Sequence, residues 1–177
     1  MSLISPKTAL VSLSDKSNLD QLIEFLVNQE VKIISTGGTY NAIKEITDEV
    51  LEVSEFTGFD EMMDGRVKTL HPKIHAGILA RRETDKEVLA DRGFEVIDIV
   101  IVNLYPFQET IASNCSFEEA IEKIDIGGPT MIRAAAKNFK DVAVVTDPND
   151  YSRLIQEWET QGGISYTFRK ELSQKVF

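Results

Sequence analysis

A basic segment runs from Arg66 to Arg82 in an otherwise acidic chain. It holds five of the 19 lysines and arginines, both histidines and no acidic residue, whereas the whole chain carries 29 acids and a net charge of −10. This concentration of cations predicts a site that receives an anion, although a solvated basic strip would have the same composition. Glycine, proline and small residues are mixed with the charges, so we expect an ordered loop here rather than an amphipathic helix.

The sequence from Thr36 to Thr39, with glycine at both inner positions, is a second indication of an anion site. It lies between an apolar run and a helical pattern, so its amides would lie at a helix N-terminus and could bind phosphate. Any tight turn can use two glycines, and the motif differs from those of dinucleotide and nucleoside triphosphate sites. Ser12, Ser14 and Lys16 would reach the same place if the first two strands are neighbours, because the carboxyl ends of parallel strands share one edge.

Further candidates lie where other elements begin or end. Asn103 and Tyr105 follow the most apolar run of the chain, so the same edge of the sheet would receive them. Asp125 precedes a helix and could act at the site or cap that helix. Arg133 and Lys137 share one face of it, and Lys137 could take part in chemistry or only favour the helix C-terminus through its charge. Together these residues predict a domain that binds a phosphorylated metabolite.

The chain offers few metal ligands. His71 and His75 are four residues apart, but Pro72 disfavours a helix there, which weakens a metal site and favours buried or loop-pairing histidines. Cys115 is the only cysteine, so an internal disulfide is excluded and a reducing cytosol is the expected compartment. A structural zinc site is therefore not expected.

The elements that must position these residues alternate between short apolar strands and helical patterns. The expected strands span residues 8–13, 31–35, 50–53, 97–102 and 142–146, with a possible short strand at 78–80. The expected helices span residues 18–29, 40–46, 85–92, 116–124, 148–160 and 165–177. One further helix is expected to begin between residues 125 and 129 and to end at residue 138. This alternation predicts an α/β fold with a mostly parallel central sheet and helices on both faces.

The composition bounds what the chain can be. Its 177 residues, 42% of them hydrophobic, suffice for one domain with a full core. The acidic balance argues against nucleic acid as a partner. No apolar run approaches the roughly 18 residues of a membrane span, and the first residues lack the pattern of a secretory signal. We therefore expect a cytoplasmic protein without a membrane partner.

Several segments, taken together and in this order, closely resemble the IMP cyclohydrolase domain of the bifunctional purine-synthesis enzyme. They are residues 11–16 (VSLSDK), 35–39 (STGGT), 55–59 (EFTGF), 65–77 (GRVKTLHPKIHAG), 103–107 (NLYPF), 124–128 (IDIGG) and 133–138 (RAAAKN). In that family the domain has a methylglyoxal-synthase-like α/β fold and precedes an AICAR formyltransferase domain. The resemblance implies that residues 1–160 form this domain and that 161–177 begin the connection to a transferase domain that is absent.

The resemblance also implies an activity. It is the ring closure of 5-formamidoimidazole-4-carboxamide ribotide to IMP with loss of water, an EC 3.5.4 type of reaction and the last step of de novo purine biosynthesis. The carboxamide nitrogen would attack the formyl carbon, so the site must help to remove a proton and stabilise charge on the formyl oxygen. No metal or other cofactor is implied, the family is a homodimer, and formyl transfer is not expected of this chain.

Roles for individual residues follow from the same resemblance. Lys137 is the candidate proton donor or acceptor, assisted by Asp125 and Tyr105, with Lys68 close to the reacting groups. The 5′-phosphate would be held by Ser14, Lys16, Thr36, Gly37, Gly38 and Thr39. The other ribotide contacts would be Ser12, Asp15, Arg66, Val67, Thr69, Val102, Asn103, Ile126 and Gly127. A lysine with the ordinary pKa of about 10.4 is a poor base, so burial or Arg133 would have to lower the pKa of Lys137.

Two alternatives from different classes share parts of this pattern. Methylglyoxal synthase, a lyase acting on dihydroxyacetone phosphate, has a related fold and phosphate turn, but residues 66–77 and 103–107 are better suited to a base and a ribose. A regulatory nucleotide-sensing module, like the allosteric domain of carbamoyl phosphate synthetase, would bind IMP-like ligands without turnover. In that module Asp125 and Lys137 would have no necessary role.

Overall fold

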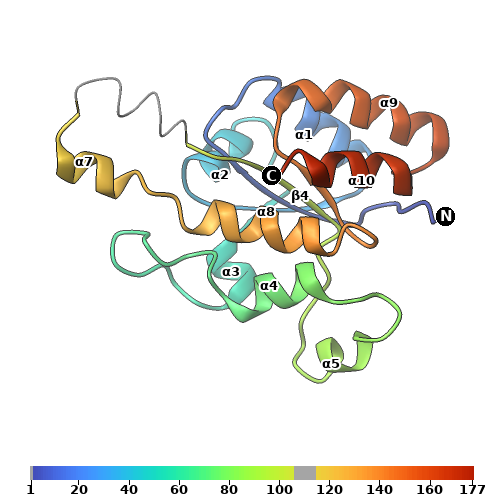
Figure 1. Cartoon of the computed structure of the whole chain (residues 1–177), viewed down its shortest axis with the longest axis horizontal. Helices are drawn as coiled ribbons and strands as arrows, with labels where there is room; N and C mark the ends of the chain where they lie inside the picture. Colours follow the sequence, from blue (N-terminus) through green and yellow to red (C-terminus); the bar gives the residue numbers. More distant parts are fainter. Residues whose placement is uncertain (1, 106–114) are drawn as a thin grey trace.

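Five parallel strands form the central sheet of the chain (Figure 1). The computed structural model describes residues 2–105 and 115–177. The strands are β1 (Thr8–Leu13), β2 (Lys32–Ser35), β3 (Val50–Glu52), β4 (Ile99–Asn103) and β5 (Ala143–Val145), in the spatial order β3-β2-β1-β4-β5. All four neighbouring pairs are parallel, so the predicted α/β fold with a parallel sheet is confirmed.

Helices cover both faces of this sheet. They are α1 (Leu19–Asn28), α2 (Gly37–Lys44), α3 (Val53–Thr57), α4 (Pro72–Leu79), α5 (Lys86–Ala90), α7 (Phe117–Glu122), α8 (Gly127–Lys137), the 3-10 helix η1 (Pro148–Asp150), α9 (Tyr151–Gln161) and α10 (Tyr166–Gln174). Helices α1, α2, α9 and α10 contribute to one apolar core, and α3, α4 and α8 to the other. Figure 1 shows α1 and α9 on one side of the sheet and α3 and α4 on the opposite side.

The alternation of side chains along β1 explains why the chain needs two cores. Ala9, Val11 and Leu13 point into the first core, whereas Leu10 points into the second. These four residues are at most 6% exposed, as expected for a central parallel strand that is covered on both faces. β1 begins and ends at the predicted residues, and both its neighbours pair with it in register.

Two predictions about the basic segment are wrong. The structure forms helix α4 from Pro72 to Leu79, where we expected a loop and a short strand at 78–80. Pro72 starts this helix instead of breaking it, because proline at the first helical position loses no hydrogen bond. His71 supplies the cap, since its Nδ1 atom accepts a hydrogen bond of 3.0 Å from the amide of Lys73.

The structure also adds and extends helices. Helix α3 was not predicted, and α2 begins at Gly37, three residues before the expected start. A capping box joins Ser116 and Glu119 at the start of α7. Residues 106 and 107 of the motif 103–107 lie outside the described residues. Within the described ranges, no helix is both long enough and apolar enough to cross a membrane.

The last helix belongs to the packed body of the chain. Ile164, Phe168 and Leu172 are at most 1% exposed and join the first core, together with residues of α9 and β5. The proposed division after residue 160 stays a prediction, but this packing favours a boundary that lies beyond α10.

Candidate functional site

The turn from Thr36 to Thr39 lies at the carboxyl edge of β2, next to the end of β1. Thr36 is extended, and Gly37 has a φ of +57°, a left-handed conformation that favours glycine. The Thr39 hydroxyl is buried; it accepts a hydrogen bond of 2.8 Å from the Leu13 amide and donates one of 3.0 Å to the Leu13 carbonyl. Among residues 2–105 and 115–177 no side chain caps α2, so its first amides could receive an anion, and the anion site at this turn stays a prediction.

Asn103 at the end of β4 organises the loop after β1. Its Oδ1 atom accepts hydrogen bonds from the amides of Ser14 (2.7 Å) and Asp15 (2.8 Å), and its Nδ2 atom donates to the Asp15 carbonyl (2.7 Å). The ammonium of Lys16 lies 3.3 Å from the Leu13 carbonyl. The structure therefore brings Asn103 to the same edge as predicted, but its side chain holds the backbone of this loop.

The carboxylate of Asp15 is part of the same loop. It accepts hydrogen bonds from the hydroxyl and the amide of Ser17, which lower the pKa of Asp15 below its ordinary value. The group is fully exposed, and its negative charge beside Lys16 would oppose an anion placed directly over it. We therefore expect its function at the site to be the folding of the loop.

Lys68 of the basic segment lies beside the turn from Thr36 to Thr39. Its Nζ atom lies 3.6 Å from the position that a β-carbon would occupy on Gly37. The neighbouring Thr69 is buried, and its hydroxyl fills the space beside Gly127, the first residue of α8. Two segments that the sequence identified separately thus meet at one point, where an ammonium group faces a helix N-terminus.

A short hairpin presents this part of the basic segment. Backbone hydrogen bonds join Met62 and Val67, with N–O distances of 3.0 and 3.3 Å. Met63, Asp64 and Gly65 between them all have left-handed conformations. Arg66 follows as an exposed side chain, and its Nε atom lies 3.7 Å from a carboxylate oxygen of Glu122 in α7.

The remaining predicted residues next to α8 lie close by. Asp125 accepts a hydrogen bond of 2.9 Å from the amide of Gly128 in the first turn of α8, although Ile126, and not Asp125, is the N-cap residue of this helix. A β-carbon on Gly128 would overlap the side chains of Asp125 and Leu104, which shows how tightly this corner is packed. Ile126 and Tyr105 are about half exposed beside it, at 53% and 54%.

Lys137 is not part of this cluster. It ends α8, ten residues after Gly127, and a rise of 1.5 Å per residue separates the two by about 15 Å. The next residue, Asn138, donates hydrogen bonds to the carbonyls of Ile78 and Ala80, at the C-terminal end of α4. The Lys137 side chain is exposed, so the burial considered for it from the sequence is absent. Arg133, its predicted neighbour, stacks over the ring of Phe177.

The two histidines make contacts that support the local structure. The Nδ1 atom of His75 lies 3.3 Å from the His71 carbonyl, and its buried Nε2 atom has no hydrogen-bond partner within the described residues. His71 packs against the ring of Phe59, with 5.8 Å between ring centroids. No cluster of three metal-ligating side chains occurs among residues 2–105 and 115–177. Cys115 is a half-buried free thiol.

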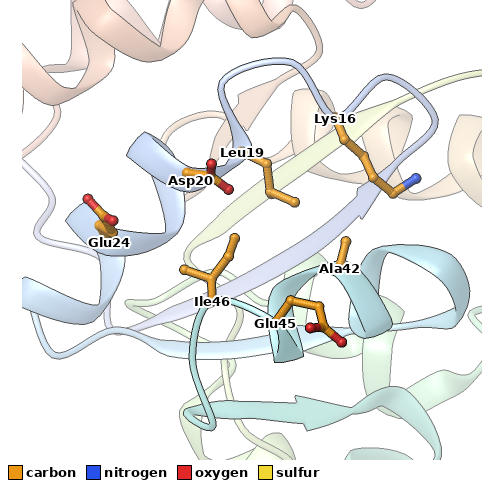
Figure 2. Close-up of a pocket in the computed structure, with 7 residues that line it drawn as sticks. All are labelled: Lys16, Leu19, Asp20, Glu24, Ala42, Glu45 and Ile46. Carbon is orange, nitrogen blue, oxygen red and sulfur yellow. The ribbon is translucent and has the colours of Figure 1, made fainter.

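A surface hollow next to the turn is a poor anion site. Figure 2 shows that it lies between α1 and α2. Its lining residues are Lys16, Leu19, Asp20, Glu24, Ala42, Glu45 and Ile46. Three carboxylates surround this hollow, and neither Lys68 nor the turn residues 36–39 contribute to it, so the anion site is better assigned to the turn.

Replacing Gly127 with alanine is expected to lower the melting temperature by about 5 °C. The new methyl group would overlap the buried Thr69 hydroxyl, and overpacking of this kind costs about 1–3 kcal/mol. Gly38→Ala is the matched control, because it also changes the first turn of a helix but its β-carbon would meet no atom within 4 Å. Thermal unfolding by circular dichroism measures both; equal midpoints would show that Thr69 moves aside freely.

The fold and this sheet edge define a methylglyoxal-synthase-like domain, and the family model described as the MGS-like domain matches residues 18–130. A second model, for the AICARFT/IMPCHase bienzyme, matches residues 135–177. The chain belongs to the family of MGS-like domains, and the curated relatives that it resembles are bifunctional purine biosynthesis proteins named PurH. The resemblance stated from the sequence motifs is therefore confirmed.

Individual relatives support this assignment. The PurH protein of Clostridium kluyveri is 56% identical over 171 residues, which cover 96% of this chain and 34% of that protein. The PurH protein of Fusobacterium nucleatum is 53% identical over 173 residues, 97% of this chain and 34% of that protein. The crystal structure of ForH has a TM-score of 0.82 at 35% identity and covers 98% of this chain and 92% of that one. This chain spans about a third of the length of its curated relatives.

Proposed function

We propose that this chain is the IMP cyclohydrolase part of a bifunctional purine biosynthesis protein. It would convert 5-formamidoimidazole-4-carboxamide ribotide to IMP and water. The observation that carries the proposal is the approach of the Lys68 ammonium to Gly37 at the N-terminus of α2. This arrangement suits the phosphate of a ribotide, and it occurs in a chain whose relatives are PurH proteins.

The reaction needs positioning and charge stabilisation. The carboxamide nitrogen forms a bond to the formyl carbon, and the tetrahedral adduct then loses the former formyl oxygen as water, with one proton from the carboxamide nitrogen and one from the formamido nitrogen. Holding both groups of one molecule in contact would supply much of the rate. Asp125 and Tyr105, next to the start of α8, are proposed to exchange these protons, and Lys68 to stabilise the developing negative charge.

The role proposed for Lys137 then requires a second copy of the chain. Lys137 lies about 15 Å along α8 from Gly127, farther than its own side chain can reach. A two-fold dimer can bring the exposed end of α8 of one copy to the sheet edge of the other, which fits the homodimer that the resemblance implies. We therefore propose that each site combines Lys68 of one copy with Lys137 of the other.

The test is a spectrophotometric assay of IMP formation from the formamido ribotide. Wild type should turn over, and Lys137→Ala should lose activity by about 100-fold if Lys137 transfers a proton. Mixing Lys137→Ala with Lys68→Met chains should restore about a quarter of the wild-type rate, because half of the dimers then hold one intact site. An inactive mixture of stable dimers would refute the shared site. Binding of IMP without turnover by wild type would favour the nucleotide-sensing alternative.

A further inference from the structure

Glu61 forms an ion pair with the lysine of the proposed phosphate site. Its Oε2 atom lies 2.6 Å from Nζ of Lys68, and the two side chains are 54% and 27% exposed. Within the described residues, no other carboxylate lies within ion-pair distance of Lys68. Neither the charge pattern nor the motifs of the sequence indicated a function for Glu61.

This ion pair lies directly beside the turn. The Lys68 side chain crosses Gly65, where an added β-carbon would lie 2.7 Å from Cε, 3.0 Å from Nζ and 3.6 Å from the Glu61 carboxylate. On its other side, the same Nζ atom faces Gly37. The Glu61 carboxylate and the start of α2 thus both lie close to the Lys68 ammonium, and an anion at the turn would share Lys68 with Glu61.

We propose that Glu61 occupies Lys68 in the ligand-free chain and weakens the binding of the anion until it withdraws. Glu61 would thus act as a specificity residue, because only a ligand whose remaining groups compensate for this competition would bind well. This inference rests on the proposed phosphate role of the turn. It adds a second carboxylate, besides that of Asp15, that opposes an anion at this site.

The hairpin that carries Glu61 can move at little cost. Glu61, Met62, Met63 and Asp64 are all exposed, and two backbone hydrogen bonds between Met62 and Val67 hold the hairpin closed. Exposed ion pairs are weak because water and salt screen them. A phosphate dianion, which offers more charge than a carboxylate and can also bind the amides of α2, would displace Glu61.

The experiment compares phosphate binding by wild type and Glu61→Gln. Inorganic phosphate is titrated calorimetrically or by amide NMR of Gly37 and Gly38 at low salt. We expect about twofold to fivefold tighter binding by Glu61→Gln, the range of an exposed ion pair. Glu95→Gln is the matched control, since Glu95 pairs with Lys32 at 2.8 Å with similar exposure but at the start of β2, on the opposite edge. It should leave phosphate binding unchanged.

A second comparison separates competition for Lys68 from a general effect of charge. In a Lys68→Met background, Glu61→Gln should no longer tighten phosphate binding. Equal tightening with and without Lys68, or no tightening in the wild-type background, would overturn the proposal. Ring closure is assayed separately: a chain with the expected Glu61 effect but no turnover would refute the proposed function alone. A chain with turnover but no Glu61 effect would refute this inference alone.

Discussion

Replacing Lys68 with methionine is expected to lower kcat/KM for ring closure of the formamido ribotide by about 100-fold. Methionine has nearly the same length as lysine but carries no charge, so the variant removes the ammonium group that faces Gly37. Charged donors that act on phosphate or on a developing oxyanion contribute about 10²- to 10³-fold when they are preorganised. The expectation takes the lower value because Lys68 is partly exposed.

The separate values of KM and kcat should also show whether Lys68 stabilises only the bound ribotide or the transition state as well. If Lys68 holds only the phosphate, KM should rise while kcat stays nearly constant, because ground state and transition state lose the same contact. If the ammonium also reaches the reacting groups, kcat should fall as well. Steady-state kinetics at several ribotide concentrations distinguish these results.

Lys73→Met is the matched control for this prediction. Lys73 belongs to the same basic segment, but its ammonium lies over the ring of Phe56, 4.8 Å from the centroid, on helix α4. Its loss should change kcat/KM less than threefold. A Lys68→Met enzyme that stays within threefold of wild type would mean that the turn binds its anion through the amides of α2 alone.

The sheet edge could be predicted from the sequence because its elements are locally encoded. Strand β1 and the turn at Thr36 have strong patterns of their own, and parallel strands bring their carboxyl ends together whatever the details of packing. The proximity of Thr39 to Leu13 and of Asn103 to Ser14 then follows from the order of the strands.

Other features depend on contacts that no local pattern reveals. Pro72 starts a helix because His71 caps that helix. A proline can either start a helix or break one, and only the contacts around it decide which of the two occurs. Lys137 was assigned to the site by resemblance, whereas the length of α8 separates it from Asp125 within one chain. Glu61 is one acid among 29, and only the fold brings it to Lys68.

The second large effect is expected from Arg169→Met, which should destabilise the chain by about 3–5 kcal/mol. Arg169 is fully buried in α10, and burial lowers the pKa of its guanidinium group. It donates hydrogen bonds to backbone carbonyls of Phe139, Lys140, Ile164 and Ser2. Methionine would remove all of these hydrogen bonds. The Ile164 carbonyl would keep its bond from the Ile4 amide, but the Phe139 and Lys140 carbonyls would lose the guanidinium donor, and each unsatisfied group costs about 1–3 kcal/mol before relaxation.

Thermal unfolding should show a melting temperature about 10 °C below that of wild type. Arg153→Met in the adjacent helix α9 is the matched control. Arg153 is half exposed and pairs with Glu171 at 2.6 Å, so its loss should cost about 1 kcal/mol or less. Arg169→Lys should rescue only part of the stability, because an ammonium cannot reach carbonyls on several sides as the planar guanidinium does.

This result bears on where the domain ends. Arg169 joins Ser2 near the start of the chain, the loop between α8 and β5, and the turn before α10, so the segment after residue 160 completes the core instead of leading away from it. If residues 161–177 only connected this domain to another, Arg169→Met would be no more harmful than Arg153→Met. A large difference between the two variants would therefore move the boundary beyond α10, and equal stabilities would keep it at residue 160.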